Sequence, residues 1–496
     1  MLNSSILKKN QHIKKNLKFG QLISLYAIYS SASIVLFFWT VLMRATLLVG
    51  MNTVYASTLP LVLLLVFFIK LYELNKRHIE KIFVCIAIPA LISFGLFILP
   101  NQIPDEIWHI YRVLNFEKNG AGNMIAPLSL QPDKTPTTFA EAYKVLLAPA
   151  DWNNVFLVSR DMSSYLSHLY FFPGIVALIG RSLWLNPYVV VYLSRMTNAA
   201  IFIVAGYWII KLIPFGKTVF FIFLLNPMLI QQEASCSADA LTNVIALMYA
   251  TFLILLLKES QIKRWQVSGL VITAVLMVVS KFAYAPLIFL SVLLVYRLIN
   301  TKKRNLVVLL ISILVTTVVI FVLAFYQVPD NTLFGYALDL VRNPVACFFV
   351  LLNTFYIQGP YWVKTFAGGV LGALSINIWA PIFWTYLIIL SISPFCNEDE
   401  DKVAFNKNER VFILVIIFID TILIILALRQ WSVQNDGNIN FISGVQGRYF
   451  FPFAIYLPLC LIRPSGAVHR SNATSVFTTL ILIILLGDFV SVLLFF

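Results

Sequence analysis

Charged residues and cysteines are both scarce in this chain of 496 residues. Charged residues make up 12% of the sequence, whereas a soluble domain carries roughly 25%. The five cysteines, Cys85, Cys236, Cys347, Cys396 and Cys460, are scattered and include no Cys-x-x-Cys pair or Cys/His ligand spacing. The sequence also shows no internal repeat, low-complexity run or linker. These absences argue against a sizeable soluble domain, a disulfide framework and a zinc site.

Apolar residues, in contrast, make up 60% of the sequence and recur in runs that approach the length of a membrane span. One α-helical span needs about 20 apolar residues. We therefore predict an all-α, polytopic integral membrane protein with about 13 transmembrane helices. They are expected near residues 21–43, 56–75, 82–99, 188–212, 216–231, 239–257, 266–281, 284–300, 305–326, 370–393, 411–429, 448–463 and 475–495.

The net charge of +14 does not indicate nucleic-acid binding, because Lys and Arg fall in short clusters between the expected spans. Such clusters mark the cytoplasmic side of a membrane protein. The apolar stretch after the basic N-terminus is too long for a signal peptide and no small-residue cleavage site follows it, so we expect a cytoplasmic, uncleaved N-terminus. The clusters are Lys8, Lys9, Lys14, Lys15 and Lys18; Lys76, Arg77 and Lys81; Lys258, Lys263 and Arg264; and Arg297, Lys302, Lys303 and Arg304.

One further apolar stretch, residues 169–185, conflicts with this charge pattern if it crosses the membrane, because every later basic cluster would then lie on the wrong side. We therefore expect an interfacial helix there. The chain then divides into three N-terminal spans (1–99), one external loop with interfacial helices (100–187) and a transmembrane bundle (188–496). Within the bundle, residues 327–369 form a second expected external loop, and loops of this length are usually functional.

The first external loop begins with Pro-Asn-Gln-Ile-Pro-Asp-Glu-Ile-Trp-His-Ile-Tyr-Arg at residues 100–112, which places charged side chains at the membrane surface. If a helix starts after the second proline, Asp105, His109 and Arg112 lie on one face of it. Asp105 and Glu106 then become candidate acids of an active site. The simpler alternative is an ordinary helix start, with Pro near the first turn and acids at the positive end of the helix dipole.

Ionisable residues inside a membrane are energetically costly and are therefore often functional. Several such residues lie at or near the external ends of expected spans. Asp239 opens one span, Lys281 ends another, Arg448 opens a third, and Arg195 lies inside a span. Each has a structural alternative. Asp239 can be a helix-start acid, Lys281 a snorkelling lysine, Arg448 a span-end anchor beside the interface aromatic Tyr449, and Arg195 the partner of a neighbour such as Asp239.

Acids beside cations on one side of a membrane suit a reaction between a hydroxyl acceptor and a phosphate-bearing donor. A carboxylate can take the hydroxyl proton. Arg binds phosphate oxygens well. This chemistry is the reading that the charged residues favour when they are taken together.

Four segments resemble the GT-C superfamily of membrane glycosyltransferases, and in particular a bacterial family of multi-pass proteins of unknown function marked by Pro-Asp-Glu and Gln-Gly-Arg-Tyr motifs. The stretches Tyr-Phe-Phe-Pro-Gly at 170–174 and Leu-Ser-Arg at 193–195 also resemble that family's loop-to-span transition. The resemblance covers about residues 80–465 and implies a GT-C-like fold. The four segments are Ile-Pro-Asp-Glu at 103–106 with His109 and Arg112, Ser-Ala-Asp-Ala-Leu-Thr-Asn at 237–243, Lys-Phe-Ala-Tyr-Ala-Pro at 281–286, and Gln-Gly-Arg-Tyr-Phe-Phe-Pro at 446–452.

The resemblance implies an inverting glycosyltransferase of the bacterial plasma membrane. Such an enzyme moves a sugar from a polyprenyl-phosphate donor to a cell-surface or lipid-linked glycan acceptor on the outer face. Its catalytic base would be an acid of the first large external loop, here Asp105 or Glu106. His109, Arg112 and Asp239 would support the acceptor.

On the donor side, the resemblance implies that the lipid phosphate is bound by Lys281, Tyr284, Arg448 and Tyr449. This chain departs from the usual GT-C layout, with two spans ahead of the loop's own span and Asp-Glu in place of Asp-x-Asp. No cofactor is therefore assigned, and a divalent metal, Mg or Mn, stays an option. The expected partners are membrane lipid, the donor, the acceptor and a separate cytoplasmic enzyme that charges the lipid, because the chain has no soluble nucleotide-sugar domain.

Two other functions compete with glycosyl transfer. A polysaccharide polymerase or ligase would share the external loops and the basic groups. A transporter or flippase of a lipid-linked glycan should show repeat symmetry and broken helices at the membrane midplane, and the sequence shows neither.

Overall fold

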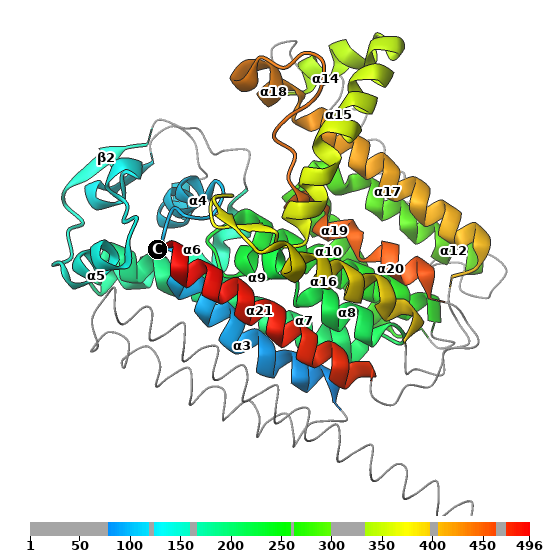
Figure 1. Ribbon diagram of the computed structural model, residues 1–496, viewed down its shortest axis with the longest axis horizontal. Helices are drawn as coiled ribbons and strands as arrows, with labels where there is room; N and C mark the ends of the chain where they lie inside the picture. The colour runs from blue at the N-terminus through cyan, green and yellow to red at the C-terminus, as the bar shows by residue number, and fades with distance from the viewer. Residues whose placement is uncertain are drawn as a thin grey trace, which may run out of the picture. The chain divides into compact units, whose positions relative to one another are not determined.

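Figure 1 shows the computed structural model, which describes residues 78–118, 124–158, 166–258, 262–298, 333–396, 405–462 and 473–496. All of them fall in one unit of the chain, Leu71–Phe496. The described part is mostly helical, with two short antiparallel hairpins, which agrees with the predicted all-α class. Three expected spans, 21–43, 56–75 and 305–326, lie outside the described residues.

Five helices among the described residues are long and apolar enough to cross a membrane, and they coincide with five of the expected spans. One of them is central, because 89% of its apolar stretch is buried, compared with 39–50% for the other four. This central helix is α10 (Ala238–Lys258). The others are α3 (Ile79–Phe97), α7 (Pro187–Leu212), α17 (Lys407–Ala427) continued by α18 (Arg429–Asp436), and α21 (Ala473–Phe495).

Local sequence explains where two of these helices begin. The Asn186 side chain accepts a hydrogen bond from the Tyr188 backbone N–H, and Pro187 occupies the first turn of α7. Asn406 and Glu409 form a capping box at the start of α17. Such caps satisfy backbone N–H groups that have no partner inside the helix.

Several of the other expected spans are interrupted, which corrects their prediction as single helices. Proline is the common element, because it lacks a backbone N–H and disrupts helical hydrogen bonding. No broken helix was apparent in the sequence, whereas three interrupted segments occur among the described residues. The span expected at 216–231 is split into α8 (Lys217–Leu224) and α9 (Pro227–Glu233). That at 284–300 consists of the 3-10 helix η5 (Phe282–Ser291) and α12 (Val292–Leu298), and that at 448–463 of η7 (Gly447–Phe450), α19 (Phe451–Ala454) and α20 (Tyr456–Leu461).

Of the two remaining expected spans that the structure describes, one is a continuous helix and the other is not. The segment at 266–281 is one helix, α11 (Arg264–Ser280). The segment at 370–393 starts with a hairpin of β3 (Val370–Leu371) and β4 (Ile376–Asn377) and becomes helical only at α16 (Ala380–Ile392).

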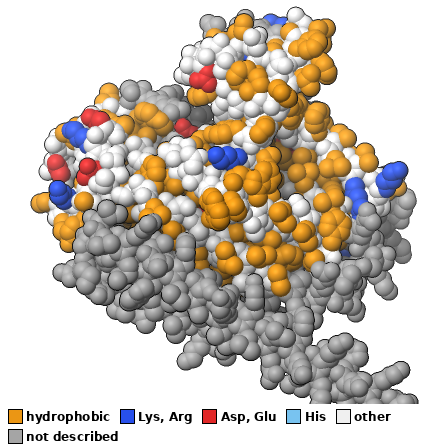
Figure 2. Space-filling model, in the orientation of Figure 1, with side chains coloured by type: hydrophobic (Ala, Val, Ile, Leu, Met, Phe, Trp, Pro, Cys, Tyr) orange, Lys and Arg blue, Asp and Glu red, His pale blue; other side chains and the backbone are white. Residues whose placement is uncertain are grey.

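Hydrophobic side chains cover much of the described surface. Large apolar side chains such as Trp208, Ile272 and Trp384 are exposed on it. On the face seen in Figure 2, the few charged side chains lie mostly toward the two sides, and hydrophobic ones spread between them. An apolar exterior of this kind is suited to contact with lipid.

The loop expected at 100–187 is folded, and its core continues into the start of α7 and of α10. It contains η1 (Phe116–Lys118), η2 (Leu128–Leu130), η3 (Pro132–Lys134), η4 (Ser167–Tyr170), α4 (Glu106–Leu114), α5 (Phe139–Leu147), α6 (Phe171–Ser182) and a hairpin of β1 (Ile125–Pro127) with β2 (Val155–Leu157). Its buried core includes Tyr111, Trp152 and Tyr170. The Tyr111 and Trp152 side chains donate hydrogen bonds to the Leu130 and Leu185 carbonyls.

The segment expected as a second loop, 327–369, is helical where it is described. It contains α14 (Leu333–Val341) and α15 (Pro344–Phe366), and α14 packs against both α15 and α18 (Figure 1). Asn343 explains the start of α15, because its side chain accepts a hydrogen bond from the Ala346 N–H. The sidedness of this segment stays a prediction.

Candidate active site

Most of the predicted site residues meet where the ends of four elements converge. Asp105 precedes α4, Asp239 lies in the first turn of α10, Lys281 separates α11 from η5, and Arg448 lies in η7. His109 in α4 interacts electrostatically with all four of these residues. Residues far apart in the sequence therefore form one charged cluster.

The first ion pair of this cluster joins Asp105 to Arg448. The Nη2 atom of Arg448 donates to Asp105 Oδ2 at 2.7 Å and also to the Tyr449 hydroxyl at 3.2 Å. The other terminal nitrogen donates to the Pro104 carbonyl at 3.0 Å and to the Gln232 amide oxygen at 3.4 Å. The Arg448 side chain is 2% exposed and that of Asp105 is 49% exposed, so the carboxylate is open to solvent and the guanidinium is not.

Backbone geometry fixes both members of this pair. Asp105 adopts the left-handed region, with φ of 62°, which Asp tolerates better than most residues. Gly447 packs directly on the end of α15. A Cβ atom there would lie 2.1 Å from the Phe366 backbone nitrogen and 2.4 Å from the Trp362 carbonyl oxygen. Glycine at this position therefore allows the close approach that places Arg448.

The second ion pair joins Lys281 to Asp239, with 3.4 Å between Nζ and Oδ1. The Lys281 ammonium lies 4.5 Å from the centre of the Tyr449 ring and 5.6 Å from that of Tyr284. The Arg448 guanidinium is 5.1 Å from the same Tyr449 ring. The Tyr284 hydroxyl donates to the Tyr449 carbonyl at 3.0 Å, so these two tyrosines connect the two ion pairs.

His109 is buried and interacts with the charged residues of this cluster. Its Nδ1 is 2.7 Å from the Tyr170 hydroxyl. Burial lowers the pKa of His109 to about 4, against the opposing attraction of the Asp239 and Asp105 carboxylates. The imidazole is therefore neutral at neutral pH.

Arg112 contacts Tyr170, which is the hydrogen-bond partner of His109. Its guanidinium lies 5.3 Å from the centre of the Tyr170 ring and donates to Ser167 Oγ at 2.7 Å and to the Asn115 carbonyl at 3.0 Å. Arg112 thus acts on the cluster through Tyr170 and His109.

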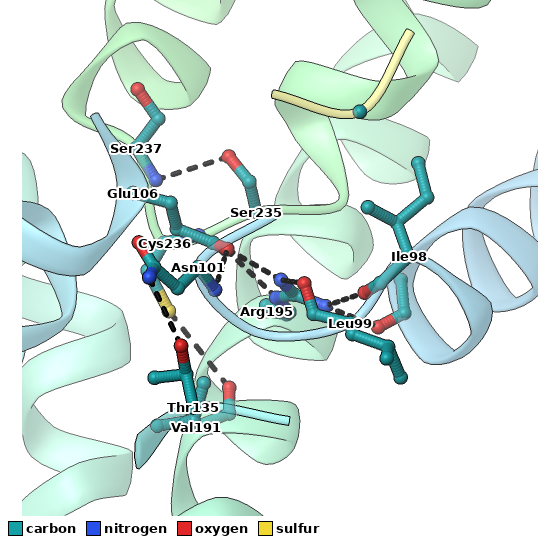
Figure 3. Close-up of polar contacts among 12 residues, drawn as sticks. Ile98, Leu99, Asn101, Glu106, Thr135, Val191, Arg195, Ser235, Cys236 and Ser237 are labelled. Atoms are coloured by element: carbon teal, nitrogen blue, oxygen red, sulfur yellow. Dashed lines mark hydrogen bonds and ion pairs between the residues drawn. The ribbon is translucent and has the colours of Figure 1, made fainter. Parts of the chain in front are cut away.

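Glu106 lies in a buried ion pair with Arg195 (Figure 3). Both side chains are fully buried, and the Arg195 Nε donates to Glu106 Oε1 at 2.8 Å while its Nη2 donates to the second carboxylate oxygen. The suggested pairing of Arg195 with Asp239 was therefore wrong. Glu106 also accepts hydrogen bonds from the backbone N–H groups of Asn101 and Cys236. These contacts leave it no access to an acceptor hydroxyl.

The arrangement does not fit a divalent-metal site. Each acid of the cluster that is near solvent, Asp105 and Asp239, already has a cationic partner. Among the residues that the structure describes, no three His, Cys, Asp or Glu side chains gather in a way that could hold a metal ion.

Sequence reasoning missed two partners of the site. Tyr170 contacts His109, and Gln232 contacts Arg448. Gln232 belongs to the run Gln231–Glu233, which interrupts an otherwise apolar stretch and is completely buried. Buried polar groups need hydrogen-bond partners, so that run was the available signal.

Lowering the pH should destabilise the protein through His109. The folded-state pKa of about 4 lies below the ordinary value of 6.5, so the unfolded chain takes up the proton first as the pH falls. Stability contributed by the neutral imidazole is complete above pH 6.5 and decreases towards pH 4, by about 1 kcal/mol per pH unit. We expect His109→Gln to flatten this decrease in detergent-solubilised protein, measured as the unfolding temperature between these pH values.

A matched control is His78→Gln, because the His78 side chain is 54% exposed and its ion pair, with Glu80 at 3.3 Å, lies at the start of α3. Its unfolding temperature should follow the wild-type pH dependence. An unchanged slope in His109→Gln would contradict the assignment to His109.

The comparisons with known proteins identify a family and nothing finer. Residues 90–457 match the family model described as "Predicted membrane protein (DUF2142)". No curated protein and no solved structure matches the chain.

Proposed function

The chain belongs to the DUF2142 family of predicted membrane proteins, and on that premise we propose that it is a GT-C-type glycosyltransferase. Its donor would be a sugar on polyprenyl phosphate, and its acceptor a cell-surface or lipid-linked glycan at the outer face of a bacterial plasma membrane. The observation that carries this proposal is the half-exposed Asp105 carboxylate, held at 2.7 Å by Arg448 in the same cluster as Lys281.

In the proposed reaction Asp105 accepts the proton of an acceptor hydroxyl. The acceptor oxygen attacks the anomeric carbon of the sugar, and the bond between that carbon and the phosphate oxygen breaks. The electron pair leaves with the lipid phosphate, whose charge the nearby cations stabilise. Arg448 binds the carboxylate of Asp105 through Oδ2, so the proposal assigns the acceptor hydroxyl to Oδ1.

The two cations are suited to different tasks. Lys281 is 30% exposed, so a donor phosphate can approach its ammonium beside Asp239. Arg448 is almost fully buried and already bound to Asp105, so it would reach the phosphate only if Asp105 moves aside. We therefore assign first contact with the phosphate to Lys281, with Tyr284 and Tyr449 beside it, and give Arg448 a second task of orienting Asp105.

A polysaccharide polymerase or ligase would use the same residues on a different acceptor. A transporter or flippase is favoured by one specific observation, the interrupted helices α8–α9, η5 and α19–α20. Broken helices near the centre of the membrane are common in transporters.

A reconstituted assay separates these functions. The protein is incubated in liposomes with polyprenyl-phosphate sugars and candidate glycan acceptors, and the products are identified by mass spectrometry. A product heavier by one sugar, with release of the lipid phosphate, supports transfer. Movement of intact donor between the two leaflets of the liposome membrane, without any such product, would instead support the flippase function.

Loss of the cations should weaken donor use. Arg448→Lys should impair transfer and Arg448→Ala should impair it more, because a lysine cannot copy the several hydrogen bonds of the guanidinium. Lys281→Ala should chiefly raise the donor KM, by about tenfold, if Lys281 binds the ground-state phosphate. A fall in kcat would instead indicate that it stabilises the leaving group.

Lys211→Ala provides a matched control. The Lys211 ammonium also lies over an aromatic ring, 4.6 Å from that of Trp208, but on an exposed turn at the end of α7. Its donor KM should stay at the wild-type value. If Lys281→Ala and Arg448→Ala behave like this control, both cations are membrane anchors.

A further inference from the structure

A second acid, Asp420, is buried inside the bundle without any partner. It lies in the middle of α17, one of the five helices able to cross a membrane, and its side chain has no exposed surface. In the described part of the chain, neither carboxylate oxygen has a hydrogen-bond partner. Buried acids are normally paired or hydrogen-bonded, so this one needs an explanation.

The titratable groups that interact with Asp420 are phenols. The helix α17 packs against η5, α20 and α14, and Tyr284 of η5 and Tyr456 of α20 are the groups that interact with Asp420. The Tyr456 hydroxyl is buried and, like Asp420, has no hydrogen-bond partner among the described residues. Tyr249 from α10 interacts with Tyr456 and donates to the Leu287 and Ile288 carbonyls of η5.

Such a site accommodates a neutral carboxylic acid far better than a carboxylate. An isolated buried carboxylate has a very large desolvation penalty, and groups in this position bind a proton instead. Ionisation would require water or a new partner to reach Asp420. Two of the elements packed against α17 can rearrange, since η5 contains Pro286 and the chain is interrupted between α19 and α20.

We propose that Asp420 is a proton-binding site inside the bundle, whose deprotonation loosens the packing of α17 against η5 and α20. The site is linked to the charged cluster through η5, which packs against α17 and carries Tyr284. The Tyr284 hydroxyl donates to the Tyr449 carbonyl, and its ring lies beside Lys281. A change in the position of η5 would therefore move Lys281 and Tyr449. The proposal does not depend on glycosyl transfer, because it requires only that a proton and the bundle conformation are coupled.

Another buried acid provides a control. Asp488 in α21 is also buried with both carboxylate oxygens unpartnered among the described residues. Its helix packs against α3, α16 and α8, away from η5 and α20. Asp488→Asn thus changes a comparable acid without touching the proposed coupling.

The first measurement uses dicyclohexylcarbodiimide, which adds to protonated carboxyl groups in apolar surroundings and leaves a stable N-acylurea. The full-length protein in detergent is treated between about pH 6 and pH 9, and the modified peptides are mapped by mass spectrometry. We expect Asp420 to be modified, with a yield that falls as the pH rises. Modification that is absent, or independent of pH, would overturn the proposal. Protection by Na⁺ at constant pH would overturn it in favour of a sodium site.

The second measurement follows the packing itself. The quantity compared is the protection factor in hydrogen exchange, which removes the intrinsic rise of amide exchange with pH. For the peptides covering η5 and α20 it should fall with rising pH in the wild type and in Asp488→Asn. In Asp420→Asn, which mimics the protonated acid, the protection factors should stay high at every pH. If this variant instead keeps the wild-type pH response, or if the wild type shows no response, the coupling is refuted. Because neither readout measures transfer, their failure is distinct from failure of the enzyme assay.

Discussion

Replacing Arg195 with glutamine is expected to lower the stability of the fold by about 3–5 kcal/mol, the largest stability effect that we predict. The variant leaves the Glu106 carboxylate fully buried without a cation. It also removes the hydrogen bonds that the guanidinium donates to the backbone carbonyls of Gly95, Ile98 and Leu99. These carbonyls lie at the end of α3, so Arg195 fastens α7 both to that helix and to the start of α4 (Figure 3).

The measurement is the unfolding temperature of detergent-solubilised protein, with Arg181→Gln as the matched control. Arg181 is exposed, although its guanidinium also lies near an aromatic ring, 5.7 Å from that of Trp152. We expect almost no shift in the control. Equal unfolding temperatures for the two variants would show that the Glu106–Arg195 pair does not hold these helices together.

A double-variant cycle tests whether the cost comes from the unpaired charge. Glu106→Gln alone leaves Arg195 without its carboxylate, whereas the combination with Arg195→Gln leaves no buried charge. The double variant should therefore lose less stability than the sum of the single ones, by at least about 1 kcal/mol. Additive losses would place the stabilisation in the backbone hydrogen bonds.

This ion pair also shows where reasoning from sequence stopped. Asp105 and Glu106 are adjacent, and both were candidate bases because composition treats two neighbouring acids alike. The left-handed backbone at Asp105 sends the two side chains in different directions, one towards Arg448 and solvent and the other into the protein. A backbone conformation of this kind at a non-glycine residue has no clear signature in one sequence.

The spans were predictable for a physical reason, and their interruptions were predictable only in part. Hydropathy located α3, α7, α10, α17 and α21. A segment that crosses lipid must satisfy its backbone polar groups by hydrogen bonds within one helix, so it appears in the sequence as one long apolar run. Pro227 and Pro286 were visible in the sequence, but a proline can either kink a helix or end it. Tertiary contacts decide between these outcomes. At Asn226, for example, the side chain both caps α9 and donates to the Phe366 carbonyl, a contact across 140 residues.

The cluster itself was predicted from the charge types and the resemblance, without its pairing. Seven of the nine candidate residues lie in the cluster or beside it, whereas Glu106 and Arg112 make structural contacts. Which charged side chains form ion pairs depends on where the helix ends lie relative to one another. An error of a few residues in a predicted span boundary is enough to exchange the partners. That explains why Arg195 was linked to Asp239 when its partner is Glu106.

Changing Asp105 to asparagine is expected to reduce glycosyl transfer by about a hundredfold or more, the scale of general-base catalysis, if the proposed function holds. Asparagine is the informative substitution because, like aspartate, it tolerates the left-handed region that residue 105 adopts at φ of 62°. Its amide oxygen can still accept the Arg448 hydrogen bond, and Arg448 keeps its contacts with Pro104 and Gln232. The expression level and the unfolding temperature should therefore change little, whereas kcat should fall and the donor KM should stay nearly constant.

The control for that experiment is Asp133→Asn, an exposed acid in η3 of the same 100–187 segment. Asp105→Glu should recover part of the lost turnover, because it restores a carboxylate at a slightly shifted position. A merely structural Asp105 would give the opposite order, since the asparagine would preserve activity and the longer glutamate would disturb the Arg448 pair. Near-normal turnover in Asp105→Asn would therefore remove Asp105 as the base and leave it the role of a helix-start acid that orients Arg448.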